Sequence, residues 1–278
     1  MSWHALRSLA FVLLLGVASA LAESAPEDPA ARAILDRAQK LDDTERAWRD
    51  RTRRMKITIH DRRGGQRVRD LSMRTLREEG SDDKILAVFG SPPDIRGTAF
   101  LQFQHREADA DQWLYLPALR RVRRITSSVK DESFMGTDFS YRDMELLTDV
   151  IEWRASEARA TLLPEGSSGE PATHRISLEP LGRDIGYQRI VITLTSDDLV
   201  LRGMDFFRPG DEDGKPSKRL ALEAVRSVGR VPTAHRMVMR QTEEDTFTEV
   251  EISGVVYDQD LPSDLFTKRS LERGLDLP

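Results

Sequence analysis

Apolar and polar residues alternate with a period of two along most of the chain after residue 55. In MKITIH, which begins at Met55, and in LSMRT, which begins at Leu71, every second residue is apolar or β-branched. Such alternation places the apolar side chains on one face of a β-strand. It predicts strands at about 55–60, 71–75, 85–89, 98–106, 113–117, 119–125, 158–163, 173–179, 187–195, 199–207, 217–227, 233–242 and 246–257.

One long segment shows the helical period instead. The dipeptide Asp-Pro at 28–29 is typical of a helix N-cap followed by the first helical residue. Ile34, Leu41 and Trp48 then fall on one face, and charged residues fill the rest. We therefore expect an amphipathic helix over 29–50.

The turns between the predicted strands are short and rich in Gly, Pro, Asp and Ser. Short strands joined by hairpin-length loops favour an antiparallel meander. With one long helix to cover one face, the expected fold is mainly β with helices (α+β). We expect a strongly bent sheet, or incomplete antiparallel β-barrel, with the helix across its mouth as a lid.

The first 22 residues have the features of a cleaved secretory signal peptide. They combine Arg7, an apolar run from Leu9 to Val17 and a small-x-small end at Ala20-Leu21-Ala22. The apolar run is too short for a spanning helix. We therefore expect residues 23–278 to form a single periplasmic domain that is not an integral membrane protein.

Composition narrows the function further. The 42 basic and 47 acidic residues give a net charge of −5, so an exported chain of this kind is not expected to bind nucleic acid. The sequence contains no Cys, which excludes disulfides, thiolate chemistry and a lipid-modified cysteine anchor.

The most informative stretch is 111–144, DQWLYLPALRRVRRITSSVKDESFMGTDFSYRDM. Trp113 and Tyr115 share one face of the first strand, with Leu114 and Leu116 on the other. Four arginines crowd the next strand: Arg120, Arg121, Arg123 and Arg124. The stretch is either a core strand followed by a solvated one, or a surface for an amphipathic, anionic partner such as a lipid.

No motif of known chemistry stands out. The histidines His60, His105, His174 and His235 are scattered singly, without metal-ligand spacing. No nucleophile elbow or phosphate-binding glycine loop is present. The sequence therefore predicts no catalytic residue, no metal site and no cofactor.

A bound apolar guest is the better interpretation of the pattern. A curved sheet that closes incompletely leaves part of its lining for a lipid tail, whose burial contributes about 25 cal/mol per Å². The alternative is that the same residues fill the core themselves. The expected lining residues are Ile57, Leu71, Met73, Phe89, Phe103, Trp113 and Tyr115.

The quoted segments resemble those of a known family. WLYLPALRRVRRI followed by SFMGTDFSYRDM resembles the signature of the LolA-like outer-membrane lipoprotein-sorting proteins. PPDIRGTAFLQF before it and LPSDLFTKRSLERG near the end resemble segments of the same group. Trp113, Tyr115, Pro117, Arg120, Arg121, Phe134, Gly136, Phe139, Tyr141 and Asp143 match the signature. Arg142, where an acidic residue is expected, and Gly229-Arg230-Val231-Pro232, which lacks an aromatic before the proline, depart from it.

The resemblance implies a non-catalytic periplasmic carrier, with a helical lid over a hydrophobic cavity. Carriers of this type take lipid or lipoprotein acyl chains from an inner-membrane transporter to an outer-membrane acceptor. The branch that this chain resembles is associated with exporters of the RND/MMPL type. A cargo-free adaptor on such an exporter and a periplasmic hydrolase are the competing interpretations.

Roles for individual residues follow from this picture. The helix 29–50 would be one lid, with Trp48 near its hinge, and 134–144 a second. Gly136 would allow the second lid to bend, and Thr137 or Asp138 would cap a short helix. The remaining lid residues are Phe134, Met135, Phe139 and Tyr141. Arg120, Arg121, Arg123 and Arg124 would meet anionic head groups or an acidic docking partner.

Overall fold

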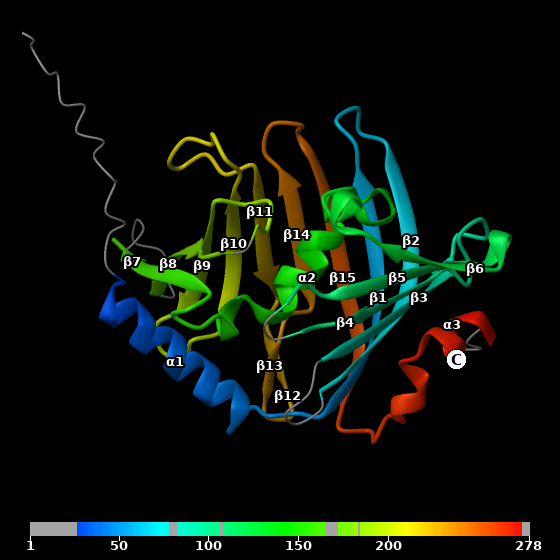
Figure 1. Ribbon diagram of the computed structural model, residues 1–278, viewed down its shortest axis with the longest axis horizontal. Helices are drawn as coiled ribbons and strands as arrows, with labels where there is room; N and C mark the ends of the chain where they lie inside the picture. Colours follow the sequence, from blue (N-terminus) through cyan, green and yellow to red (C-terminus); the bar gives the residue numbers. More distant parts are fainter. Residues whose placement is uncertain (1–26, 78–82, 106–107, 165–171, 183, 274–278) are drawn as a thin grey trace, which may run out of the picture.

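The computed structural model describes residues 27–77, 83–105, 108–164, 172–182 and 184–273 (Figure 1). The predicted signal peptide, 1–22, lies outside these residues. The strands are β1 (Asp50–His60), β2 (Gln66–Leu76), β3 (Lys84–Ser91), β4 (Ala99–Phe103), β5 (Asp111–Leu116), β6 (Arg121–Ile125), β7 (Ala158–Leu163), β8 (Thr173–Pro180), β9 (Arg189–Thr195), β10 (Leu201–Phe207), β11 (Lys218–Glu223), β12 (Arg226–Val228), β13 (Val231–Thr233), β14 (Arg236–Gln241) and β15 (Thr246–Tyr257). The helices are α1 (Pro29–Asp43), α2 (Tyr141–Asp149) and α3 (Lys268–Arg273), with 3₁₀ turns η1 (Pro117–Leu119), η2 (Ser127–Val129), η3 (Phe134–Gly136), η4 (Val150–Glu152) and η5 (Ser263–Leu265).

The described strands form one large antiparallel sheet and one small hairpin. The order in the large sheet is β6-β5-β4-β3-β2-β1-β15-β14-β11-β10-β9-β8-β7, and β12 pairs with β13. Most neighbouring strands in the sheet are also consecutive in sequence. The β12–β13 hairpin is inserted between β11 and β14, and the last strand, β15, pairs with the first, β1. The edge strands β6 and β7 do not pair with each other, so the sheet is not closed into a barrel. The predicted bent meander is confirmed.

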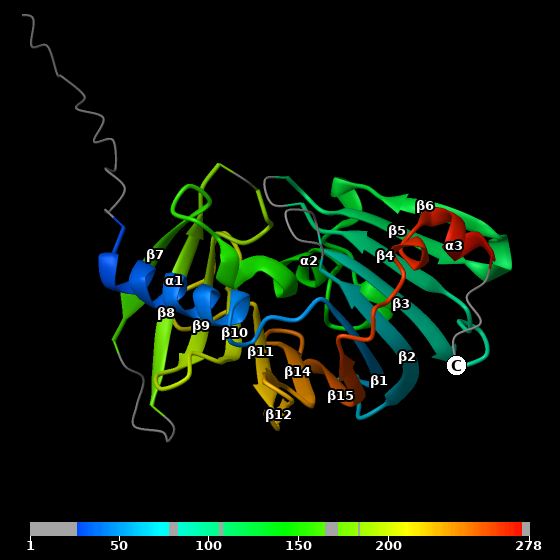
Figure 2. The same cartoon turned by 90° about the horizontal axis from the view of Figure 1, so that it is seen from below.

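The sheet is strongly curved, and the helices lie on different sides of it (Figure 2). α2 lies within the concave side, between the two ends of the sheet (Figures 1 and 2). α1 runs past the ends of β7 to β10, at one mouth of the half-barrel. α3 packs on the outside of β4, β5 and β6. Among the described residues, no helix is both long and apolar enough to cross a lipid bilayer.

Alternation along β3 to β5 buries side chains on both faces of the sheet. Ile85, Ala87 and Phe89 belong to the large core on the concave side. Their neighbours Leu86 and Val88 belong to a smaller core that includes Phe266 and Leu271 of the C-terminal segment. Because successive side chains point to opposite faces, the two cores lie on opposite sides of the same strands.

The helix predicted over 29–50 is shorter than expected. The Asp28 carboxylate caps it as predicted, accepting a hydrogen bond from the Ala30 amide at 2.8 Å. The helix ends at Asp43, where the Thr44 hydroxyl donates to the Lys40 carbonyl at 2.6 Å and the backbone leaves the helical region. Trp48 therefore lies in the connection to β1 and not on the helix.

The cap of α2 also differs from the prediction. Ser140, and not Thr137 or Asp138, is the N-cap residue, and its hydroxyl accepts from the Asp143 amide at 3.1 Å. The Asp143 carboxylate accepts in return from the Ser140 amide at 2.7 Å, which completes a capping box. Arg142, which departs from the family pattern, pairs with Asp131 at 2.6 Å.

Candidate functional site

A cavity of about 220 Å³ lies on the concave side of the sheet, and we call it the inner cavity. Its floor comes from β1, β2, β14 and β15, and its cover from η3, α2 and the residues between them. Apolar side chains dominate the lining, which is Arg51, Arg53, Met55, Ile57, Leu71, Met73, Ile85, Phe134, Thr137, Phe139, Met144, Leu147, Leu201, Leu222, Pro232, Thr233, Ala234, Met237, Val250 and Ile252. The set contains no carboxylate, serine or histidine, so it offers no acid–base or nucleophilic pair.

Three of the predicted lining residues lie in this cavity. Ile57 of β1 and Leu71 and Met73 of β2 all face it. Phe89 is buried in the same core beside Phe134, with 6.1 Å between the ring centroids, but is not among the lining residues. The alternation of β1 and β2 thus identified the inward face correctly.

The structure corrects the other three predicted lining residues. Phe103, Trp113 and Tyr115 belong to the smaller core under the C-terminal segment, on the opposite face of the sheet. Lys268 of α3 lies over the Trp113 ring, 5.1 Å from its centroid. The residues next to them in sequence face the concave side instead, as Leu114 does in the large core. The signature aromatics therefore anchor α3 and do not line the inner cavity.

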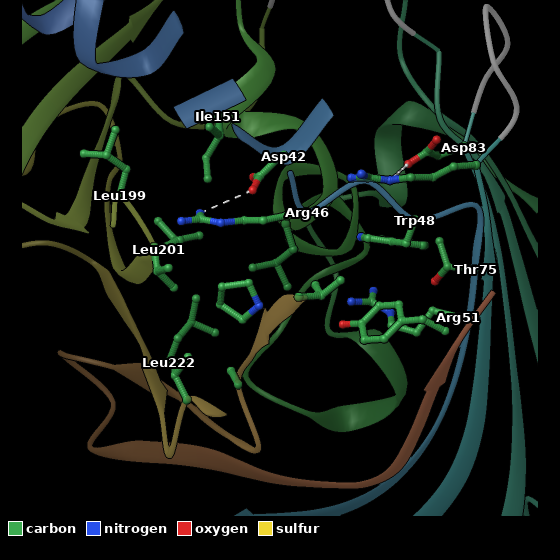
Figure 3. Close-up of a pocket in the computed structure, with 18 residues that line it drawn as sticks. Asp42, Arg46, Trp48, Arg51, Thr75, Asp83, Ile151, Leu199, Leu201 and Leu222 are labelled. Atoms are coloured by element: carbon green, nitrogen blue, oxygen red, sulfur yellow. Dashed lines mark hydrogen bonds and ion pairs between the residues drawn. The ribbon is translucent and has the colours of Figure 1, made fainter. Parts of the chain in front are cut away.

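A second cavity of about 240 Å³, the mouth cavity, adjoins the first (Figure 3). The two share the lining residues Arg51, Leu147, Leu201, Leu222, Pro232 and Ala234. The mouth cavity extends to the end of α1, where Asp42 and Arg46 pair at 3.5 Å. Together the two cavities extend from the interior to the end of α1. Each alone is smaller than typical small-molecule sites, which occupy roughly 300–1,000 Å³.

Trp48 lies in the mouth cavity between two guanidinium groups. Arg51 is 4.7 Å and Arg77 4.3 Å from the centroid of its ring. Arg77 is neutralised by Asp83 at 3.2 Å and by Glu152 at 3.7 Å. Cations over an indole face are attracted by its quadrupole, so these contacts fix the Trp48 ring at the entrance.

The predicted second lid, 134–144, packs over the inner cavity. Phe134 and Phe139 line the cavity. Tyr141 is buried against Phe134, with ring centroids 5.5 Å apart. Met135 and Gly136 have φ angles of +52° and +73°, which is the bend that the glycine was expected to permit. The Met135 carbonyl accepts a hydrogen bond from Arg69 of β2.

Buried polar groups tie this segment to the sheet. Asp143 accepts hydrogen bonds from Lys218 Nζ at 2.7 Å and from the Tyr187 hydroxyl at 2.8 Å. Burial, followed by the Asp143 charge, raises the pKa of Tyr187 well above its usual value, so the phenol remains a donor. Asp138 accepts from Thr248 of β15 at 2.6 Å. These contacts hold α2 and Asp138 against β11 and β15.

The helix α1 is held in a different way. At its first turn, the Asp28 carboxylate also accepts from the Leu162 amide of β7 at 3.1 Å, and Arg32 donates to the Ala158 carbonyl at 2.9 Å. At its other end, Arg46 donates to the Asp198 carbonyl. These hydrogen bonds lie at the two ends of α1, while Leu35 and Ala38 between them are buried in the large core, and the second end lies beside the mouth cavity.

The four arginines of the basic stretch do not form one surface. Arg121 and Arg123 pair in register with Leu116 and Leu114, and so lie on the concave side of the edge strand β6. Arg124 pairs with Trp113 on the convex side and forms an ion pair with Asp111. Arg120 sits in the turn before β6 with a φ of +47°. All four are exposed.

Sequence reasoning missed Arg51, Arg53 and Thr75. Arg51 and Arg53 occupy the same inward register as Met55 and Ile57 on β1, and Thr75 pairs with Arg51 across the ladder. The signal was present, because the period-two pattern of β1 extends back to residue 51. Charged residues are usually exposed, so Arg51 and Arg53 do not indicate an inward face from the sequence alone.

The comparisons with known proteins agree with this architecture. A protein-family model described as "-like: Uncharacterized protein" matches residues 81–273. The chain is 27% identical to a DUF1329 family protein from Desulfovibrio piger, with a TM-score of 0.77 over 87% of this chain and 98% of that one. A LolA superfamily protein from Nitrosomonas europaea, 15% identical, shares the fold with a TM-score of 0.63 over 86% of this chain and 98% of that one. No curated protein matches the sequence.

An outer membrane lipoprotein-sorting protein domain from Vibrio parahaemolyticus is 28% identical to the chain. The match covers 86% of this chain and 98% of that one, with a TM-score of 0.76. The family match spans more than half of the chain and includes the signature stretch 111–144. The open antiparallel sheet, its helices and these matches show that the chain belongs to the LolA-like outer-membrane lipoprotein-sorting family.

Proposed function

We propose that the protein is a non-catalytic periplasmic carrier, which holds a lipid or the acyl chains of a lipoprotein and passes them between components of the cell envelope. The observation that carries the proposal is the inner cavity. It is lined almost entirely by apolar side chains, and it adjoins a mouth cavity beside the end of α1. The family membership supports the same role.

Elementary energetics explains why such a carrier needs partners. Burial of a methylene group contributes about 0.8 kcal/mol relative to water, so ten of them hold a lipid by about 8 kcal/mol. A bilayer offers the chain equally apolar surroundings, and the cavity alone therefore does not favour extraction. A donor protein and an acceptor protein must therefore supply the free energy that drives the lipid out of one membrane and into the other. This is in keeping with a carrier between an inner-membrane transporter and an outer-membrane acceptor.

The edge strand β6 is our candidate for partner docking. It has one unpaired edge in the described sheet, and it carries Arg121, Arg123 and Arg124, with Leu119 57% exposed in the preceding turn. Unpaired strand edges are surfaces to which other chains add. Replacing Arg120, Arg121, Arg123 and Arg124 with Ser is expected to weaken uptake or docking without unfolding the protein.

Native mass spectrometry of the protein purified from the bacterial envelope tests the proposal. A carrier is expected to retain a lipid that organic solvent extracts. The competing function, a cargo-free adaptor on an RND/MMPL-type exporter, uses the same exposed edge of β6. Absence of lipid together with tight binding to a transporter would favour the adaptor and contradict the carrier.

A further inference from the structure

Two arginines line an otherwise apolar cavity without a carboxylate partner. Arg51 and Arg53 occupy successive inward positions of β1, which lie about 7 Å apart along a strand. Among the described residues, neither forms an ion pair, and none of the residues lining the inner cavity is acidic. The charge of Asp83, which lines the mouth cavity and pairs with Arg77 at 3.2 Å, also acts on Arg51.

The described contacts of these guanidinium groups are with uncharged side chains. Arg53 Nη2 lies 2.8 Å from the Met73 thioether, a poor acceptor. Arg51 stacks on Trp48 and interacts with the Tyr257 hydroxyl. The Nε atoms of both arginines are buried without a hydrogen-bond partner among the described residues. Burial lowers the pKa of Arg53 well below its usual value, and the neighbouring Arg51 charge lowers it further.

A third unpartnered donor lies beside them. Thr75 is 3% exposed, and its hydroxyl has no partner among the described residues. It pairs in register with Arg51 across β1 and β2, which places the two Cβ atoms about 5 Å apart. Figure 3 shows Thr75 and Arg51 side by side in the mouth cavity. Arg51, Arg53 and Thr75 each keep one unpartnered donor atom, and Arg51 lines both cavities where they adjoin.

We propose that the cargo carries an anionic head group, a carboxylate or a phosphate, and that Arg51, Arg53 and Thr75 bind it at this junction. The inference rests on the proposed carrier function and specifies its cargo. Arginine forks match both anions, and charge-assisted hydrogen bonds are stronger than neutral ones. Because the anion would replace lost hydration, it would offset the cost of keeping two guanidinium groups away from water.

The layout of β1 orients such a cargo. The inward positions run from Arg51 and Arg53 at the mouth end to Met55 and Ile57 deeper in the sheet. From Arg53 to Ile57 the strand rises about 13 Å. The head group therefore lies at the junction, and the hydrocarbon tail extends along the apolar half of the same strand. A tail in this position contacts Phe139, which covers the inner cavity.

Isothermal titration calorimetry with three ten-carbon probes tests the inference: decanoate, decyl phosphate and 1-decanol. We expect the wild-type protein to bind both anions at least tenfold more tightly than 1-decanol, and the tighter of the two to identify the head group. Arg53→Met is expected to remove this preference without weakening the binding of 1-decanol. Arg53→Lys is expected to retain part of it.

Two controls keep the outcomes distinct. Arg54→Met removes the neighbouring exposed charge on the other face of β1, and is expected to leave the preference unchanged. Arg53→Met is expected to raise the melting temperature of the ligand-free protein, because it removes a half-buried charge without a carboxylate partner. Equal affinity of the wild type for 1-decanol and for both anions, or a lower melting temperature for Arg53→Met, would overturn the inference and leave the carrier intact. Failure of all three probes to bind would instead contradict the carrier function.

Discussion

Lys218 of β11 donates a hydrogen bond to Asp143 of α2 at 2.7 Å, and both side chains are buried, 3% and 0% exposed. The pair joins α2 to β11, a strand that lies far from α2 in the sequence. A second buried pair, Lys130 with Glu145 at 2.9 Å, holds the same helix from the preceding segment. These two buried pairs bind α2 to the sheet and to the segment before it.

The first prediction concerns this buried pair. Lys218→Met leaves the Asp143 carboxylate buried without its cation, and is expected to lower the free energy of unfolding by about 3–5 kcal/mol. Urea denaturation measures the difference. The matched control is Lys215→Met, which breaks an exposed ion pair with Glu212 and should cost about 0–1 kcal/mol. Equal effects of the two substitutions would mean that α2 is not anchored in this way.

The second prediction concerns the end of α1 beside the mouth cavity. Arg46→Ala removes the contacts with the Asp198 carbonyl and with Asp42. Because each contact is weak, we expect a bound lipid probe to dissociate roughly two- to fivefold faster, with little change in melting temperature. Stopped-flow release measures this rate. Arg49→Ala, which breaks the exposed pair with Asp260, serves as the control and should leave release unchanged.

The third prediction concerns pH and the other end of α1. Backbone hydrogen bonds from Leu162 and Ala30 hold the pKa of Asp28 below its usual 3.8. A carboxyl whose pKa is depressed on folding contributes stability above its unfolded pKa, and this contribution is lost as the pH falls through the folded value. We therefore expect the Ala30 and Leu162 amides to exchange hydrogen faster, relative to the rest of the protein, as the pH falls below about 4.

Two substitutions check this assignment by hydrogen exchange. Asp28→Asn keeps an oxygen acceptor at the N-cap and removes the titration, so the extra opening at low pH should disappear. Asp36→Asn changes an exposed carboxylate on the same helix and should leave it in place. Persistence of the acid-induced opening in Asp28→Asn would show that another group controls this end of α1.

The fourth prediction concerns the path between the two cavities. Ala234 lines both of them, and Ala234→Phe is expected to obstruct the passage and to weaken lipid binding at least tenfold. Ala221→Phe is the matched control. Ala221 is half-buried on the other face of β11, between Gly203 of β10 and Val238 of β14. Equal lipid binding by both variants would exclude this path.

The sequence predicted the strands well because their alternation and turn residues are strong local signals. It failed to assign faces where both sides of the sheet are buried. Trp113 and Leu114 are both 8% exposed, because α2 and its flanking loops cover one side and α3 the other. Alternation shows which residues share a face and does not show which face is concave.

Two other misses have local causes. Trp48 fits the helical period of α1, yet Thr44 ends the helix and the Arg51 and Arg77 side chains hold the indole elsewhere. Arg51 and Arg53 fit the inward period of β1 but carry charge, which normally indicates an exposed face. In both places a tertiary contact overrides the local rule, and both lie at the candidate site.

Fluorescence quenching by a brominated acyl chain tests most directly whether hydrocarbon occupies the concave side. One variant keeps Trp48 at the mouth, with Trp3, Trp113 and Trp153 changed to Phe; the other keeps Trp113 on the outer face, with Trp3, Trp48 and Trp153 changed to Phe. With decanoate brominated at either end, we expect saturable quenching of Trp48 by at least one probe and no saturable quenching of Trp113. Saturable quenching of Trp113 alone, or of neither tryptophan, would contradict the account.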